Sequence, residues 1–138
     1  MRKGLYLILI ALTTLLSCGK DNNLLPSYPV NFSAPLTDPR LNRLSSPGGA
    51  VIINGHGIAG LVIYRRPDNT YVAFDRCSTV DPDKKCAVDL DDPSVTVTDP
   101  CSGAKFSLFD GGPVKAPAKL ALRQYVVSIG GNTLHVSN

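Results

Sequence analysis

The sequence has no basic stripe and no acidic tail. Its 14 Lys and Arg residues and 11 Asp and Glu residues give a formal net charge of +3 and are spread along the chain. Nucleic-acid binding depends on clustered Lys and Arg that neutralise phosphates, so this class of partner is not expected. The adjacent Lys84 and Lys85 lie in a polar segment and indicate a solvated turn.

Helical periodicity is also missing after residue 17. No window in that part of the chain repeats apolar side chains at i, i+3 and i+4. Short apolar or alternating runs are separated by Gly, Pro and Asn, as strands are by their turns. These runs are residues 50–53, 61–64, 71–74, 95–98, 105–108, 125–129 and 133–136. They predict an all-β fold, a sandwich or small barrel of antiparallel sheets.

Signatures of catalysis are absent as well. The chain has no Gly-x-Ser-x-Gly motif, and the two histidines, His56 and His135, are expected in a turn and a strand, away from Ser102. The acidic segment at residues 81–92 lacks the central glycine of an EF-hand loop and is expected to be solvated. The sequence therefore predicts no enzyme activity.

The first 17 residues have the pattern of a secretory signal. Arg2 and Lys3 precede an uncharged run of 12 residues, 5–16, which fits the core of such a signal. A membrane-spanning helix needs about 20 residues, so the run is short for one. It ends before Ser17 and Cys18, which resemble the lipobox of bacterial lipoproteins. The resemblance implies that residues 1–17 are a signal peptide and that Cys18 is lipidated.

Lipidation of Cys18 implies a stable membrane anchor, because several acyl chains together hold a protein on a bilayer. Residues 19–21, Gly-Lys-Asp, resemble the tag that some bacteria use to send lipoproteins to the cell surface. The expected location is the cell envelope, anchored at the outer membrane, with the periplasmic face and the cell surface both left open.

The exported part divides into a tether and a domain. Residues 18–47 contain five prolines and are expected to hold the domain off the membrane. Apolar residues within this segment suggest an edge strand and a turn, and the prolines would keep the strand short and peripheral. Residues 48–138 are expected to form a single β domain.

Three cysteines remain for this part of the chain: Cys77, Cys86 and Cys101. An oxidising compartment promotes pairing, and an odd number predicts one disulfide and one thiol without a partner. A zinc site would use these three with a fourth ligand such as Asp99. Disulfide formation competes and no two cysteines are separated by only two residues, so no metal is predicted and zinc remains an alternative.

The two cysteine-bearing segments also stand in a characteristic order. Residues 73–79 read AFDRCST and residues 99–106 read DPCSGAKF, and residues 110–114 (DGGPV), 116–120 (APAKL) and 124–127 (QYVV) follow. This order resembles the Rieske iron–sulfur domain, with a first cluster loop after a strand, a second loop containing Pro-Cys-x-Gly-x-x-Phe, and a proline loop before a C-terminal hairpin. Over residues 48–138 the resemblance implies a Rieske-like arrangement of small antiparallel sheets with a two-loop cluster-binding subdomain.

The cluster-ligand positions depart from the family pattern. A Rieske cluster takes two thiolates and two imidazoles, supplied by Cys-x-His in the first loop and Cys-x-x-His in the second. Cys77 matches the first cysteine, whereas Thr79, Asp99 and Ser102 stand at the other three positions. A neutral hydroxyl is a poor iron ligand beside imidazole or thiolate. The resemblance thus implies a degenerate member without its [2Fe–2S] cluster.

Some Rieske proteins also have a disulfide between the two loops, and its positions map to Cys86 and Cys101. Pairing of Cys77 with Cys101 is the competing arrangement. A Cys86–Cys101 bridge would close a loop of about 15 residues, worth roughly 3 kcal/mol by the chain-entropy model. The expected function is a non-catalytic, lipid-anchored binding or accessory module with an unknown protein partner in the cell envelope. Electron transfer by a divergent [2Fe–2S] centre is the alternative.

Overall fold

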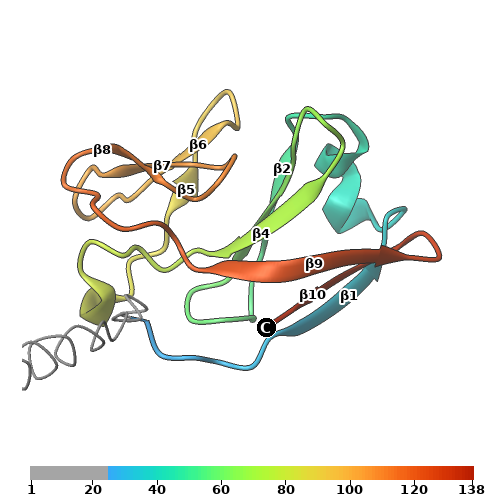
Figure 1. Cartoon of the computed structure of the whole chain (residues 1–138), viewed down its shortest axis with the longest axis horizontal. Coiled ribbons are helices and arrows are strands. Elements are labelled where there is room, and N and C mark those ends of the chain that lie inside the picture. The colour runs from blue at the N-terminus through green and yellow to red at the C-terminus, as the bar shows by residue number, and fades with distance from the viewer. Residues whose placement is uncertain (1–24) are drawn as a thin grey trace, which may run out of the picture.

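The computed structural model describes residues 25–138 (Figure 1). The predicted signal peptide, Cys18 and residues 19–21 lie outside the described residues. Two antiparallel sheets contain the ten strands of the described part of the chain. Among residues 25–138, no helix is long and apolar enough to cross a membrane.

The larger sheet has six strands in the order β1-β10-β9-β4-β3-β2. Their bounds are Asn31–Pro35 (β1), Ala50–Ile53 (β2), Leu61–Arg65 (β3), Tyr71–Asp75 (β4), Gln124–Gly130 (β9) and Thr133–Ser137 (β10). β9 joins the two halves of the sheet, since it pairs with β10 on one side and with β4 on the other, where Tyr125 lies opposite Ala73.

The smaller sheet has four strands in the order β5-β6-β7-β8. Their bounds are Asp89–Leu90 (β5), Thr96–Thr98 (β6), Lys105–Ser107 (β7) and Pro113–Lys115 (β8). In Figure 1 this sheet lies beside one end of the larger sheet, and the connection from β8 to β9 runs back along that end.

Two apolar clusters hold the sheets together, and we name them the sheet core and the interface core. The sheet core contains side chains from all six strands of the larger sheet, so that sheet curls around it. It consists of Val30, Phe32, Ala34, Leu41, Leu44, Val51, Ile53, Leu61, Ile63, Ala73, Tyr125, Leu134 and Val136. The interface core lies between the two sheets and consists of Ala50, Val62, Tyr64, Val72, Phe74, Val88, Val97, Ala104, Phe106, Leu108 and Leu122.

Residues in β3 and β4 alternate between the two cores. Leu61 and Ile63 enter the sheet core, whereas Val62 and Tyr64 enter the interface core. Successive side chains of a strand point to opposite faces, so a strand covered on both faces reads as a continuous apolar run. This explains why residues 61–64 are apolar without interruption.

The predicted all-β class and antiparallel sheets are confirmed, and seven strands lie where the apolar runs predicted them. The strands β5 and β8 and the 3-10 helices η1 (Pro39–Ser45) and η2 (Pro82–Lys84) were not predicted as such. β1 is the expected edge strand, but the packed fold begins before residue 48. Phe32 in β1 and Leu41 and Leu44 in η1 are at most 3% exposed, because they fill the sheet core.

Candidate functional site

Two loops meet at the junction of the two sheets and form the candidate site. The first loop, residues 76–88, connects β4 to β5, and the second loop, residues 99–104, connects β6 to β7. A disulfide between Cys86 and Cys101 joins them, with 6.4 Å between the Cα atoms. The predicted pairing is therefore confirmed, and Cys77 is the remaining free, buried cysteine among residues 25–138.

Asp99 begins the second loop and binds both loops through its carboxylate. It is 2% exposed and accepts hydrogen bonds from the hydroxyl groups of Ser78 (2.7 Å) and Ser102 (2.6 Å). The backbone N–H of Cys101 donates to its other oxygen at 2.8 Å. Burial opposes ionisation of Asp99, but the bonds from Ser102 and Ser78 outweigh it and lower the pKa of the carboxyl below its usual value.

Cys77 occupies the first ligand position and is fully buried. Its sulfur lies near two backbone carbonyl oxygens, those of Ser78 (3.8 Å) and Pro82 (3.9 Å). Burial, and then the negative charge of Asp75, raises the pKa of the Cys77 thiol to about 11. The thiolate is the form that binds metals and acts as a nucleophile, so this environment disfavours both roles.

Thr79 stands at the second ligand position and is bonded to the segment that precedes β9. Its hydroxyl group donates to the carbonyl oxygen of Leu120 at 2.8 Å. Leu120 belongs to the proline loop, residues 116–123, which connects β8 to β9. Thr79 thus ties the first loop to the proline loop.

Asp75, the last residue of β4, anchors the base of the first loop. It is fully buried and accepts hydrogen bonds from the backbone N–H groups of Ile58 (2.7 Å) and Cys77 (2.8 Å). The phenol of Tyr125 donates to the same carboxylate at 2.8 Å. Burial and this bond to Asp75 raise the pKa of Tyr125 far above its usual value.

The sequence interpretation did not include Asp75 or Ser78. Both are fully buried polar residues whose side-chain oxygens are hydrogen-bonded. Asp75 directly follows the apolar run of residues 72–74, and a carboxylate in that position indicates a buried acceptor for the next backbone amides. Ser78 gave no such signal, since its partner Asp99 is 21 residues away in the sequence.

The residues at the four ligand positions do not fit a Rieske cluster, which needs two thiolates and two imidazoles. One thiol, two hydroxyl groups and one carboxylate stand at these positions. The hydroxyl groups and the carboxylate are all engaged in hydrogen bonds within or between the two loops and the proline loop. The histidines lie elsewhere. His56 packs edge-on against Phe32 at 5.3 Å between ring centroids, and His135 is exposed on β10 opposite Ser128.

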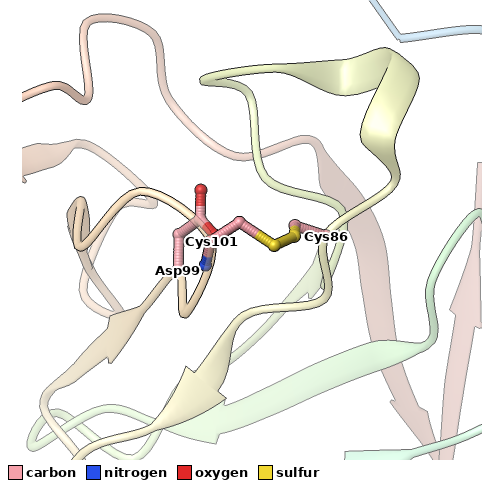
Figure 2. A group of neighbouring side chains, drawn as sticks. All are labelled: Cys86, Asp99 and Cys101. Carbon is pink, nitrogen blue, oxygen red and sulfur yellow. A yellow bond between two sulfur atoms is a disulfide. The ribbon is translucent and has the colours of Figure 1, made fainter.

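The four residues of the alternative zinc site are only partly brought together. The ligand atoms of Cys86, Asp99 and Cys101 lie within 4.8 Å of one another, and Cys77 is not part of this group. Figure 2 shows Asp99 beside the disulfide that joins the two cysteines. With both sulfurs in that bond, neither can supply the thiolate that zinc binds.

Comparisons with known proteins agree with this architecture. No protein-family model matches the chain, and no curated protein matches it. The ferredoxin of carbazole 1,9a-dioxygenase from Nocardioides aromaticivorans IC177 is similar in structure, with a TM-score of 0.52 and 20% identity over 80% of this chain and 97% of that one. The plasma membrane Rieske protein of Synechocystis PCC 6803 gives 0.54 and 20% identity over 80% and 98%.

A third structure, a ferredoxin from Sphingomonas yanoikuyae B1, gives a TM-score of 0.50 and 17% identity over 70% of this chain and 93% of that one. At these identities the likeness concerns the fold. The chain has the fold of Rieske-type [2Fe–2S] domains.

Proposed function

We propose that this chain is a lipid-anchored protein of the cell envelope whose Rieske-fold domain has lost its iron–sulfur cluster. The domain acts as a non-catalytic binding or accessory module for another envelope protein. Lipid on Cys18 attaches it to the outer membrane, at the periplasmic face or the cell surface.

The observation that carries the proposal is the hydrogen bonding of Asp99. In a Rieske domain the corresponding position supplies a cysteine ligand, and the cluster itself joins the two loops. Here the Asp99 carboxylate joins them instead, through Ser78 of the first loop and Ser102 of the second. Together with the Cys86–Cys101 disulfide, these bonds supply the connection between the loops that a cluster would otherwise make.

Electron transfer by a divergent [2Fe–2S] centre is the second candidate. It is favoured by the fold, since two of the similar structures are ferredoxins. It is opposed by the ligand positions, which offer one thiol with a pKa of about 11 and no imidazole.

A ligand-restoring variant separates the two candidates. The native chain and a Thr79→His/Asp99→Cys/Ser102→His variant are incubated anaerobically with ferrous iron and sulfide, and their visible spectra are recorded before and after dithionite. The proposal expects no iron–sulfur absorption from the native chain. Absorption that bleaches with dithionite in the native chain would show a reducible iron–sulfur centre and so favour the second candidate, and the variant serves as the positive control.

The anchor has its own test. The full chain is expressed in a bacterium and its membranes are floated on a density gradient, beside a Cys18→Ser variant. The native protein should float and carry an acylated N-terminal cysteine by mass spectrometry, and the variant should not. A native protein that remains in the soluble fraction would contradict the anchor.

A further inference from the structure

The disulfide that joins the two loops is open to solvent on one side and has a buried carboxylate on the other. Cys101 is exposed and Cys86 is half-buried, whereas Asp99 is only 2% exposed. The ligand atoms of the three residues lie within 4.8 Å of one another, and Figure 2 shows them side by side. Exposed disulfides are the more readily reduced class. A dithiol reductant therefore has access to these sulfurs.

The backbone of each loop is held by hydrogen bonds that do not depend on the disulfide. In the second loop, the N–H of Asp99 donates to the carbonyl oxygen of Ala104, and the N–H of Gly103 donates to the carbonyl oxygen of Asp99, both at 2.8 Å. In the first loop, the carbonyl oxygen of Cys86 accepts from the N–H of Ser78 at 2.8 Å. The hydroxyl group of Ser78 also binds Asp99 across the loops. Reduction should therefore leave the two thiols beside each other and beside the carboxylate.

The carboxylate of Asp99 is oriented and still has capacity for a further partner. Its Oδ2 accepts hydrogen bonds from the hydroxyl groups of Ser78 and Ser102. Its Oδ1 accepts one from the backbone N–H of Cys101. A carboxylate oxygen has two lone pairs, so Oδ1 retains one for a metal ion. Metal-binding carboxylates are commonly held in place by such hydrogen bonds.

Two thiolates and one carboxylate are a ligand set that suits zinc. Zn²⁺ binds both sulfur and carboxylate oxygen, and it forms sites in which three protein ligands leave the fourth position to water. Cu(I) prefers sulfur alone, and Mg²⁺ and Ca²⁺ prefer oxygen alone. Tetrahedral zinc places two thiolates about 3.7 Å apart, and a disulfide bond holds its sulfurs about 2 Å apart. Rotation of the two cysteine side chains supplies this small separation.

We propose that reduction of the Cys86–Cys101 disulfide creates a zinc site between the two loops. A dithiol transfers two electrons and two protons to the disulfide and itself becomes a disulfide. Zn²⁺ then displaces the two thiol protons and binds both thiolates, one oxygen of Asp99 and a water molecule. The loops are thus linked by a covalent bond in the oxidised chain and by zinc in the reduced chain.

This site differs from a Rieske centre and goes beyond the proposed function. Of its three residues, only Asp99 stands at a cluster-ligand position, and Cys77 takes no part because its sulfur is not in the group. The site does not require lipid on Cys18, so its tests and the flotation test of the anchor succeed or fail separately.

Zinc titration of the two redox states is the first test. The full chain with Cys18→Ser, in mild detergent, has no thiol other than those at residues 77, 86 and 101. It is compared oxidised and after phosphine reduction and anaerobic desalting, with a chromogenic chelator as competitor for zinc. The reduced chain should bind one zinc ion and the oxidised chain at least tenfold less. Cobalt(II) in place of zinc should give thiolate-to-cobalt absorption only with the reduced chain. Equal binding by both states, or none by the reduced chain, would overturn the site.

Single substitutions assign the ligands. Cys86→Ser and Asp99→Asn should each weaken zinc binding about tenfold or more. Cys77→Ser is the matched control, since it removes a cysteine but keeps all three ligands, and its zinc affinity should stay within about twofold of the parent. Circular dichroism checks that each variant is folded. Loss of zinc binding in Cys77→Ser, or full binding in Cys86→Ser, would contradict the assignment.

The reduction potential of the disulfide tests the same site without altering a ligand. Because zinc binds only the dithiol form, free zinc at 100 times its dissociation constant should favour that form about 100-fold. The potential should then rise by about 60 mV, at roughly 30 mV for each tenfold change. A glutathione redox buffer and a metal buffer fix the two concentrations, and acid-quenched alkylation reads the thiols. A potential that zinc leaves unchanged would overturn the proposal.

Discussion

The strands of the larger sheet contain four to seven residues, whereas those of the smaller sheet contain two or three. Each strand of the larger sheet contributes to the sheet core, and β3 and β4 are covered on both faces. The smaller sheet has one apolar side, toward the interface core, and its strand β8 is fully exposed.

The smaller sheet and its loops are also held by side-chain hydrogen bonds and by a disulfide. Asp91 accepts hydrogen bonds from the hydroxyl groups of Thr96 (2.5 Å) and Thr98 (2.6 Å) and from the ammonium of Lys105 (2.9 Å). Asp99 and the Cys86–Cys101 disulfide join the two loops. The comparison indicates that apolar burial specifies the larger sheet, whereas side-chain bonds hold the loop region in place.

The first prediction, with the largest expected effect, concerns the interface core that the sheets share. Phe106 in β7 is fully buried, so Phe106→Ala should lower the free energy of unfolding by about 3–5 kcal/mol. Phe109→Ala is the matched control, since Phe109 is 57% exposed, and should cost less than about 1 kcal/mol. Urea denaturation measures both. Equal losses would mean that the smaller sheet is not held by this core.

The second prediction separates the two regions by their covalent link. Cys86→Ser/Cys101→Ser should lower the free energy of unfolding by about 3 kcal/mol, because the disulfide closes a loop of 15 residues. Native-state hydrogen exchange should show faster exchange at Val97 and Phe106 than in the native chain, with Ile63 in the larger sheet changing least. A uniform increase at all three residues would contradict the division into two regions.

The third prediction concerns Asp99. Asp99→Asn should cost about 1.5–3 kcal/mol, since the carboxylate accepts bonds from both loops and an amide replaces one acceptor by a donor. Asp83→Asn, at an exposed position in the first loop, is the matched control and should be near neutral.

The pH dependence of Asp99 follows from its lowered pKa. Its contribution to stability is complete above the unfolded value of about 3.9 and is lost as the pH falls through the lower folded value. The native chain and the Asp99→Asn variant should therefore differ most in stability above about pH 4 and converge in stronger acid. A difference that grows as the pH falls would have the wrong sign.

The fourth and smallest effect concerns the Cys77 thiol. With a pKa of about 11, about one thiol in a thousand is ionised at pH 8, so iodoacetamide should modify the folded chain very slowly. The rate should rise about tenfold per pH unit below the pKa, and unfolding in urea should abolish the protection. Rapid modification of the folded chain at neutral pH would show that the first loop opens readily.

The strands of the larger sheet are easier to predict from the sequence than those of the smaller sheet, because more of their side chains are buried in apolar cores. Residues 61–64 and 71–74 were predicted as strands because burial imposes a pattern on neighbouring residues. β5, with two residues, and β8, with three exposed residues, have no apolar period to detect. Their strand pairing depends on contacts that are distant in the sequence.

The candidate site shows the same limit. The resemblance to the Rieske pattern favoured the Cys86–Cys101 disulfide over the competing Cys77–Cys101 pairing, and the structure confirms the favoured pairing. The bond between Ser78 and Asp99, 21 residues apart, depends on how the loops fold against each other. The placement of Thr79 against Leu120 likewise depends on the path of the proline loop.

We propose that hydrogen bonds and a disulfide hold the loops in place of an iron–sulfur cluster. The most direct measurement is the iron and acid-labile sulfide content of the full-length native protein, purified anaerobically without reconstitution. We expect negligible iron and sulfide per chain and an intact Cys86–Cys101 disulfide by non-reducing peptide mapping. Near-stoichiometric iron and sulfide would contradict the claim and would require a ligand set that begins with Cys77.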